Sequence, residues 1–195
     1  ILNCDYPPNF FLNEEKLREE IKMSRTPIRD ALGRLEQEHL VKIYPKKGFR
    51  ITDIKNEEIE KIFELRMLIE PYALLKFGCE IDMETWKDFE VFYSQHYDSA
   101  SQKKIFARDD KFHHLFIDAS KNQYLIHFYN SLFNQLSRLR FLSGYNKFQR
   151  LREGKKEHLA ILRFCVKKDW TKAADSLRMH LERSKESAYN IKFDG

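Results

Sequence analysis

The chain is poor in cysteine, glycine and proline, and each shortage excludes a class of protein. Six glycines and five prolines in 195 residues are too few for a long flexible linker or a low-complexity region. The three cysteines, Cys4, Cys79 and Cys165, are an odd number without C-x-x-C spacing. A secretory signal, an apolar run of about 18 residues or more and a solenoid repeat are also missing. We therefore expect a reduced, soluble, cytoplasmic protein with no membrane partner.

The composition is otherwise that of an ordinary globular chain with a small excess of positive charge. Hydrophobic residues make up 42% of the sequence, and the length fits one large domain or two small ones, of which we expect two. Lys and Arg number 35 against 30 Asp and Glu, which gives a net charge of +5 and a pI near 9.0. This balance favours a polyanionic partner only weakly, so the clustering of basic residues is more informative than their total.

Residues 24–36 have the pattern of a helix with one basic face. The apolar residues recur at i, i+3, i+4 and i+7 and form one stripe: Ile28, Ala31, Leu32 and Leu35. The polar residues near the helix start share the opposite face: Arg25, Thr26 and Arg29. Either Ser24 is the N-cap with Pro27 in the first turn, or Thr26 is the cap and Pro27 is the first helical residue.

The flanks of this helix complete a larger pattern. Residues 14–21 predict a short helix, with Leu17 and Ile21 facing inward, that a tight turn separates from the basic helix. After the basic helix, apolar residues alternate on both sides of a turn at 45–48, which predicts a two-stranded hairpin. Four basic residues and no acid lie between Glu38 and Asp53: Lys42, Lys46, Lys47 and Arg50. A winged helix-turn-helix uses such a helix in the major groove and such a hairpin beside the phosphates.

The alternative for the basic helix is a solvated face on an ordinary helical hairpin. For one isolated basic amphipathic helix we would favour that alternative. The turn, the helix and the basic hairpin occur here in order, however, and together they favour DNA binding. Our candidates for DNA contacts are Ser24, Arg25, Thr26 and Arg29 on the helix and Lys46, Lys47 and Gly48 on the wing.

The run from Leu12 to Ile51 resembles the winged helix-turn-helix of the GntR family of bacterial transcriptional regulators. In that family a leucine-rich helix precedes the pattern [ST]-R-T-P-[VI]-R-[ED]-A-L-x-R-L, and Gly-Leu-Val then leads into a wing that ends in glycine. Almost every position is matched. The departures are Lys22, where a glycine is usual in the turn, and His39, where a glycine usually precedes Leu-Val. Both place a side chain where the backbone is expected to need unusual φ and ψ.

The start of the chain also has a counterpart in this family. Tyr6-Pro7-Pro8-Asn9 resembles the turn that follows the family's first helix, with Asn9 where a glycine is usual. We therefore expect most of that first helix to be missing or truncated in this sequence.

From Asn56 onward the pattern is helical throughout. Asn56 suits an N-cap, and Glu57 and Glu58 would follow in the first turn, where the helix dipole favours them. The first helical stripe is expected to break or kink at Pro71, and further helices are expected near 82–98, 102–119, 122–142, 148–167 and 169–189. We predict a mainly α chain, with a winged helix-turn-helix domain at 1–54 and an all-helical bundle at 55–195.

An aspartate and three histidines stand at positions that should face the bundle core. Asp109 and His113 share one helix face with Phe112 and Phe116, and His158 and His180 lie on the apolar stripes of two other helices. Burying such groups is unfavourable unless they are paired or bound to a cation. A D-x-x-x-H pair with one histidine from each of two other helices can converge on a divalent metal. A single buried histidine is more often a hydrogen-bonded core residue, so spacing alone leaves the two interpretations about even.

Residues 59–188 resemble the helical effector domain of the FadR branch of GntR regulators, the FCD domain. Its motifs stand here as Arg66-x-x-x-Glu70, Asp109-x-x-Phe112-His113, Ala119-Ser120-Lys121-Asn122, Glu157-His158, Asp169-x-x-x-Ala173 and Arg178-x-His180-Leu181. The resemblance implies that Asp109, His113, His158 and His180 bind a divalent metal, zinc first, with nickel or manganese as alternatives. His114 points about 100° away around its helix and is expected to be a neighbour.

The resemblance also implies a ligand-responsive function. In that family the effector is a small organic acid whose carboxylate completes the metal coordination with help from pocket arginines, and the candidates here are Arg66, Arg138 and Arg140. Each could equally be a salt-bridge residue. We therefore predict a homodimeric, metabolite-responsive transcriptional regulator, usually a repressor in such families and not an enzyme, that binds a palindromic operator in double-stranded DNA.

Two other interpretations of the histidines stay open at this point. A purely structural metal would stabilise the bundle whether or not an acid binds. A metal-dependent hydrolase would need an open metal position and a general base. No glutamate stands in an H-E-x-x-H arrangement, and Glu157, beside His158, could as well face elsewhere as act on a water molecule.

Overall fold

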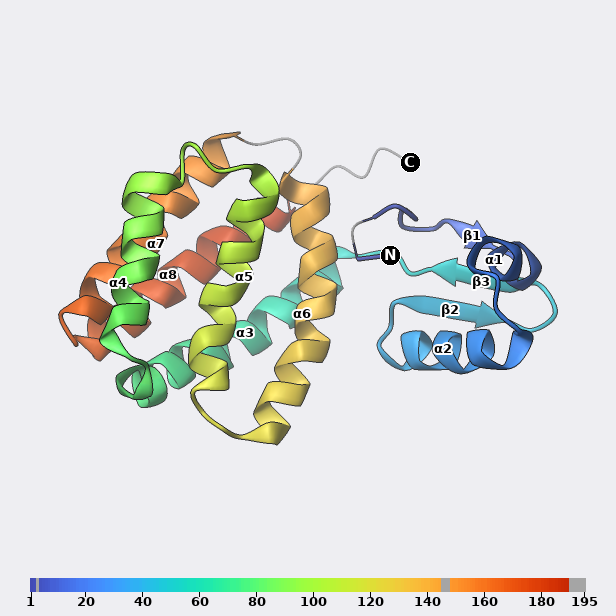
Figure 1. Cartoon of the computed structure of the whole chain (residues 1–195), viewed down its shortest axis with the longest axis horizontal. Helices are drawn as coiled ribbons and strands as arrows, with labels where there is room; N and C mark the ends of the chain where they lie inside the picture. The colour runs from blue at the N-terminus through green and yellow to red at the C-terminus, as the bar shows by residue number, and fades with distance from the viewer. Residues whose placement is uncertain (3, 145–147, 190–195) are drawn as a thin grey trace.

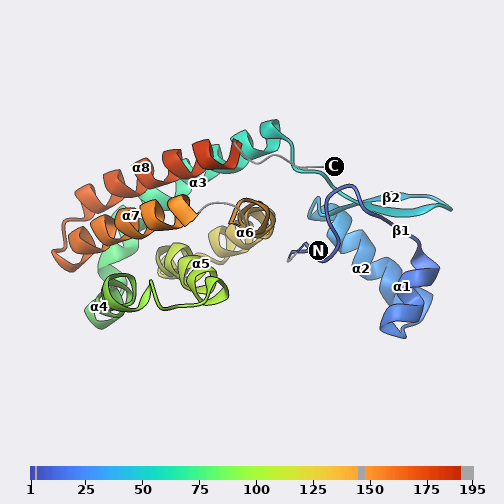
Figure 2. The ribbon, with the colours of Figure 1, turned by 90° about the horizontal axis from the view of Figure 1, so that it is seen from above.

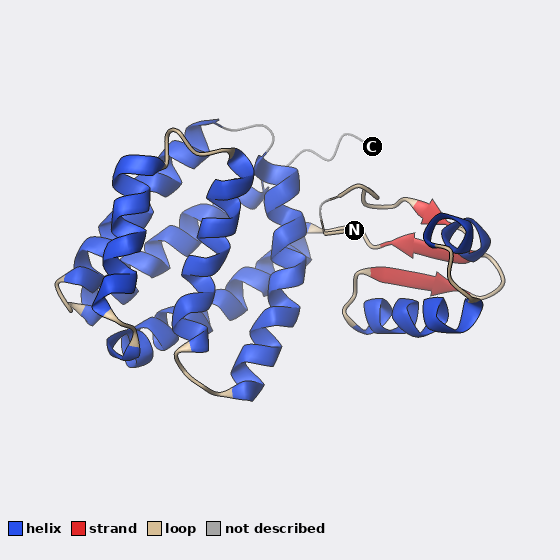
Figure 3. Cartoon of the chain, in the orientation of Figure 1, coloured by secondary structure: helices blue, strands red, loops and turns tan. Residues whose placement is uncertain are grey.

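The computed structural model describes residues 1–2, 4–144 and 148–189. Within these ranges, only the backbone is described for residues 140–144 and 148. Figures 1 and 3 show a small unit of strands and two helices at the N-terminal end and a helical bundle beside it. In Figures 1 and 2 the bundle helix nearest to the small unit is α6. None of the described helices is long and apolar enough to cross a membrane.

The elements follow the order expected from the sequence. The N-terminal unit contains β1 (Phe11–Leu12), α1 (Glu14–Ile21), α2 (Arg25–Gln37), β2 (Val41–Tyr44) and β3 (Gly48–Ile51). The bundle contains α3 (Asn56–Phe77), the 3₁₀ turn η1 (Gly78–Glu80), α4 (Met83–Val91), the π-helical turn η2 (Phe92–His96), α5 (Gln102–Asp118), α6 (Gln123–Gly144), α7 (Phe148–Val166) and α8 (Trp170–Tyr189). The prediction of a mainly helical chain with a small wing is confirmed.

The sheet has one more strand than the sequence pattern predicted. Its order is β1-β3-β2, with both pairs antiparallel. The hairpin of β2 and β3 is confirmed, and β1, which the sequence analysis did not predict, pairs with the other edge of β3. A strand of two residues is too short to show an alternating pattern. Gly48 lies at φ +127°, where an added Cβ would lie 2.4 Å from the carbonyl oxygen of Leu12.

Helix α2 begins after Ser24, which is the N-cap, as one of the two expected alternatives had it. Ile28 and Leu32 are buried against the sheet, and Leu35 packs at the edge of the same cluster. Two residues differ from expectation, because Ala31 is exposed and Ile21, the last residue of α1, is 46% exposed. The small sheet packs against Ile28 and Leu32, and Ala31 and Ile21 lie outside this apolar cluster.

Helix α3 starts one residue earlier than expected, at Asn56, and continues beyond Pro71 to Phe77. Its N-cap is Lys55, whose backbone N–H donates to the Glu58 carboxylate at 3.2 Å. The expected break at Pro71 was wrong, since α3 runs unbroken from Asn56 to Phe77 with Pro71 buried inside it. Proline removes one helical hydrogen bond, and burial of Pro71 beside the buried Ala73 and Leu74 offsets that loss.

Two apolar clusters organise the bundle. The larger one is built around buried aromatic residues that include Trp86, Phe112 and Phe116. The smaller one lies at the junction with the N-terminal unit, because it joins Ile54 of the connecting segment to residues of α3, α6 and α8: Ile59, Ile62, Phe63, Leu136, Leu139 and Ala188.

Helix α6 also makes polar contacts with the N-terminal unit. Arg138 is buried and its guanidinium donates to the backbone carbonyl and the hydroxyl of Thr52, the latter at 3.0 Å. One turn earlier, the Gln135 amide donates to the backbone carbonyl of Glu38 at 2.7 Å, and the Asn134 amide donates to its carboxylate at 2.9 Å. One face of α6 therefore holds the end of α2 and the end of the wing.

Candidate metal centre and DNA-contact surface

Three helices bring the predicted histidines together inside the bundle. His113 of α5, His158 of α7 and His180 of α8 are all buried, and one ring nitrogen of each lies within 4.8 Å of the others. Asp109, one turn before His113, places its Oδ1 atom 2.9 Å from Nε2 of His158 and 3.9 Å from Nε2 of His113. The four residues named from the sequence thus share one site. His114 lies outside it and contacts Asn130.

Each histidine uses its Nδ1 atom for a hydrogen bond away from the centre. His113 Nδ1 lies 2.7 Å from the Glu70 carboxylate, and His180 Nδ1 lies 2.7 Å from the Glu157 carboxylate. His158 Nδ1 lies 2.8 Å from the backbone carbonyl of Gly154. Ionised carboxylates and carbonyls only accept, so each Nδ1 must carry the proton and donate it. The Nε2 atoms are left with lone pairs, as in metal-bound histidines whose orientation is fixed by outer partners.

The lone pairs converge on a centre that could hold a cation. In this tautomer the Nε2 atom of His158 and the Oδ1 atom of Asp109 are both acceptors, yet they lie 2.9 Å apart. The Nε2 atoms of His113 and His158 are buried without a hydrogen-bond partner among the described residues. Buried acceptors that face one another are unfavourable unless a proton or metal ion lies between them. Three imidazole nitrogens and one carboxylate oxygen form a donor set that suits zinc.

Burial lowers the pKa of two of the imidazoles, those of His113 and His180, and so keeps them neutral. It lowers the pKa of His113 to about 4, although the neighbouring Glu70 opposes the change. Burial, with His158 beside it, lowers the pKa of His180 to about 3. Burial alone would raise the pKa of Glu157, but His180 and Arg150 outweigh it and lower that pKa to about 2. Neutral imidazoles held by ionised carboxylates are in the protonation state that a metal needs.

A cavity opens beside this cluster and reaches it. It encloses about 830 Å³, open solvent at its mouth included, and its lining contains Asp109, His158 and His180. Arg66 also lines it, as predicted, but the Arg66 guanidinium is buried in an ion pair with Glu70, with 2.5 Å between Nε and Oε1. The Tyr129 hydroxyl donates to the same carboxylate at 2.8 Å.

The other two predicted effector arginines do not join this cavity in the described part of the structure. Arg138 is absent from the cavity lining and contacts Thr52 of the N-terminal unit instead, so its role in effector binding stays a prediction. The side chain of Arg140 lies outside the described part of the structure, so its predicted role stays a prediction.

The cavity lining contains an arginine that the sequence analysis missed. Arg150 of α7 donates to both carboxylate oxygens of Glu157, at 3.0 and 2.9 Å, and to the Ser184 hydroxyl at 2.7 Å. Its position two turns before Glu157 on one helix was the available signal. Glu157 is therefore fully engaged by Arg150 and His180, and it is not placed as a free base for hydrolysis.

The DNA-contact candidates lie on one surface of the N-terminal unit. A depression between α2 and the wing is lined by Arg25, Arg29, Lys46, Lys47 and Gly48. Both arginines are exposed and form ion pairs with the start of α1: Arg25 with Glu15 at 3.2 Å and Arg29 with Glu14 at 3.1 Å. Ser24 and Thr26 are exposed at the beginning of the same helix.

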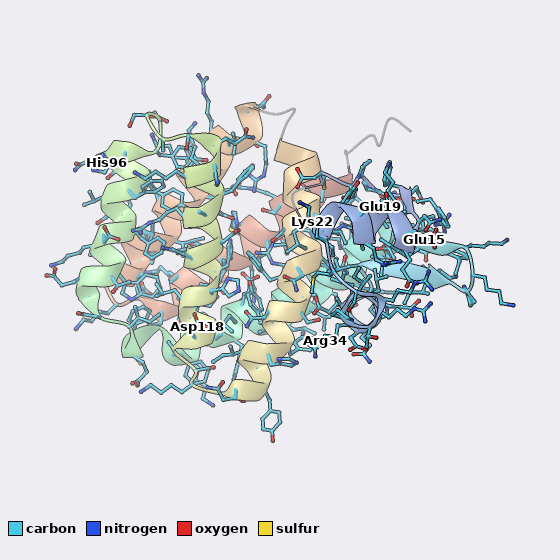
Figure 4. All side chains as sticks on the ribbon, turned by 45° about the vertical axis from the view of Figure 1, so that its right-hand side comes forward. Glu15, Glu19, Lys22, Arg34, His96 and Asp118 are labelled. Atoms are coloured by element: carbon cyan, nitrogen blue, oxygen red, sulfur yellow. The ribbon has the colours of Figure 1, made fainter. Side chains whose placement is uncertain are left out.

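Three positions where glycine was expected have left-handed backbone. Asn9, Lys22 and His39 have φ of 65°, 53° and 58°. The expectation of unusual backbone at Lys22 and His39 is therefore confirmed. Lys22 is the C-cap of α1 and lies on the surface of this unit with Glu15 and Glu19 (Figure 4). A side chain with Cβ at such φ is strained by roughly 1–2 kcal/mol.

Comparisons with known proteins agree with this division. Residues 1–51 match the family described as bacterial regulatory proteins, gntR family, and residues 61–183 match the FCD domain. The HTH-type transcriptional regulator YdhC of Bacillus subtilis strain 168 is 26% identical over 199 residues, spanning 100% of this chain and 88% of the relative.

Solved structures show the same fold. Escherichia coli McbR/YncC aligns with a TM-score of 0.80 at 18% identity, covering 96% of this chain and 91% of that one. The Zn²⁺-bound FCD domain of TM0439 aligns with a TM-score of 0.61 at 21% identity, covering 71% of this chain and 97% of that domain. The chain therefore belongs to the gntR family of bacterial regulators and carries an FCD domain after its helix-turn-helix.

Proposed function

We propose that this regulator responds to a small organic acid that binds beside a divalent metal, and that this binding changes its affinity for operator DNA. The observation that carries the proposal is the common orientation of His113, His158 and His180, whose Nδ1 atoms are all engaged outside the cluster while their Nε2 atoms converge. These residues and Asp109 would hold the metal, for which zinc suits the donors best. When bound, the metal supplies a positive centre for a carboxylate.

The DNA half of the proposal uses the exposed basic surface. Ser24, Arg25, Thr26 and Arg29 would contact base edges and phosphates, while Lys46, Lys47 and Gly48 of the wing would lie along the backbone. Phosphates would replace Glu14 and Glu15 as partners of the two arginines. A second copy of the chain, joined through the helical bundle, would present the same surface to a palindromic site.

Helix α6 offers one route between the two halves. Leu136 and Leu139 line the cavity, and Arg138, between them in sequence, holds Thr52. An acid that shifts Leu136 and Leu139 would therefore disturb the contact between Arg138 and Thr52. Helix α3, which follows the wing in the chain and lines the cavity with Phe63 and Arg66, is a second route. A coupling of about 1–3 kcal/mol would be typical of allosteric proteins.

Two observations favour sensing over the alternatives. A purely structural metal would not need the cavity that reaches Asp109, His158 and His180. A hydrolase would need a free base, and Glu157 is held by Arg150 and His180 instead. We therefore propose a regulator without catalytic activity. We also place the boundary between the DNA-binding and metal-binding domains between residues 54 and 55.

Replacing His158 with alanine tests the proposal. His158→Ala should lower the zinc content measured by elemental analysis and abolish release of DNA by acid, while the ligand-free protein still binds DNA. His114→Ala is the matched control, because His114 lies next to His113 but outside the cluster, and it should keep both properties. A His158→Ala protein with full metal content, or with an unchanged acid response, would remove the site from this role.

A further inference from the structure

The cavity is chemically divided along its length. The histidine end carries Asp109, His158 and His180, and the remainder is lined mainly by apolar side chains. These include Phe63, Phe106, Leu136, Leu139, Leu151 and Ala188, with Arg150, Ser184 and Ser187 as polar groups among them. Leu136, Leu139 and Ala188 also belong to the apolar cluster at the junction with the N-terminal unit. A bound molecule that fills this space must therefore place an apolar body against most of its wall.

The helix register gives the direction and length of the apolar part. Helices α7 and α8 are joined by a short turn and pack together, so they run in opposite directions. Two steps therefore point in the same direction along the bundle: from His158 back to Leu151 on α7, and from His180 forward to Ala188 on α8. At 1.5 Å per residue, these steps correspond to roughly 10 Å.

The charges in the lining leave a place for one carboxylate. Both described arginines of the lining already hold carboxylates, Arg66 with Glu70 and Arg150 with Glu157. A divalent cation beside the single carboxylate of Asp109 would retain one positive charge. One ligand carboxylate would neutralise it. A second carboxylate at the other end would meet apolar side chains and Arg150, which Glu157 already neutralises, and a charge without a free partner there is strongly disfavoured.

We propose that the effector is an elongated monocarboxylate, with its single charge at the histidine end and an uncharged, mainly apolar body that extends toward α6. This inference rests on the proposed function and narrows its ligand. Compact hydroxy acids and di- or tricarboxylates fit the cavity less well, because they leave the apolar end empty or bring charge into it.

Calorimetric titration of the zinc-loaded full chain with acetate, butanoate, hexanoate and octanoate tests this division. Each added pair of methylenes should tighten binding on the order of tenfold until the apolar end is filled. Suberate has the length of octanoate with a carboxylate at both ends, and it should bind at least about a hundredfold more weakly than octanoate.

Two variants locate the effect in the cavity. Phe106→Gln should reduce the gain per methylene without lowering the zinc content, because Phe106 is a half-buried part of the apolar lining. Phe164→Gln is the control, since Phe164 is also half-buried but does not line this cavity, and it should keep the parental dependence on chain length.

The outcomes separate this inference from the function on which it rests. Zinc-dependent binding of acetate and octanoate with equal affinity would overturn the inference and leave the proposed function standing. Suberate binding as tightly as octanoate would do the same. Failure of every acid to bind the zinc-loaded protein would overturn both.

Discussion

The arginine ion pairs at the DNA-contact surface are exposed, whereas those beside the histidine cluster of the bundle are buried or nearly so, although the bundle also carries exposed pairs such as Arg178–Asp175. The guanidinium-bearing side chains of Arg25 and Arg29 are 58% and 67% exposed in their pairs with Glu15 and Glu14. Arg66 and Glu70 are 3% and 0% exposed, and burial of Glu70 is outweighed by Arg66 and His113, which lower its pKa. Exposed pairs contribute little and can be exchanged for phosphates. A buried pair is hard to break, because loss of one partner leaves an unsatisfied charge.

The largest expected effect comes from breaking the buried pair. Glu70→Ala should lower the free energy of unfolding by about 3–5 kcal/mol, because it leaves Arg66 buried without its carboxylate. It also removes the acceptor of the His113 Nδ1 proton and of the Tyr129 hydroxyl. Urea unfolding of the metal-free protein measures the loss. Glu15→Ala is the surface control, expected to change stability by less than about 0.5 kcal/mol, and equal losses at both sites would contradict the comparison.

A smaller effect is expected where an exposed arginine meets DNA. Arg29→Ala should weaken binding to the specific operator by about 1–3 kcal/mol and relax the preference at one base pair. Lys47→Ala, at the tip of the wing, should weaken all duplexes alike and reduce the salt slope by about one. Titrations of specific and random duplexes at several salt concentrations distinguish the two. Equal losses on both duplexes would remove Arg29 from base recognition.

The two regions also differ in backbone strain. Five of the seven described non-glycine residues at positive φ lie in the N-terminal unit: Cys4, Asn9, Lys22, His39 and Lys46. Lys22→Gly should therefore raise the free energy of unfolding by about 1 kcal/mol, because glycine adopts this φ without strain. Lys16→Gly, on the exposed side of α1, is the matched control and should lower stability by about 1 kcal/mol. A loss of stability in both variants would show that Lys22 is not strained.

Much of this architecture could be predicted from the sequence because it depends on local periodicity. The stripe with Ile28 and Leu32 predicted α2, and the alternation around 45–48 predicted the wing. Asp109 and His113 could be paired in advance because residues four apart share a helix face. The sequence could also anticipate unusual backbone at Lys22, since family patterns carry glycine there.

The features that were missed depend on contacts between distant segments. Arg138 had no local sign of its role, because its partner Thr52 lies 86 residues earlier in the chain. β1 was missed because two residues show no alternation, and it is defined only by its pairing with β3. Pro71 was expected to interrupt α3, and only the burial around it shows why the helix continues.

The hydrogen bonds from α6 to Glu38 and Thr52 affect how DNA-binding domains could be exchanged between relatives. Gln135 and Arg138 donate to backbone carbonyls of the N-terminal unit, which any foreign unit of the same fold would also present. Two further contacts depend on side chains, because Asn134 donates to the Glu38 carboxylate and Arg138 also donates to the Thr52 hydroxyl. A chimaera with another relative's DNA-binding unit should therefore dock without redesign of most of the junction. Its switching would then depend on whether position 38 still offers a carboxylate and position 52 a hydroxyl.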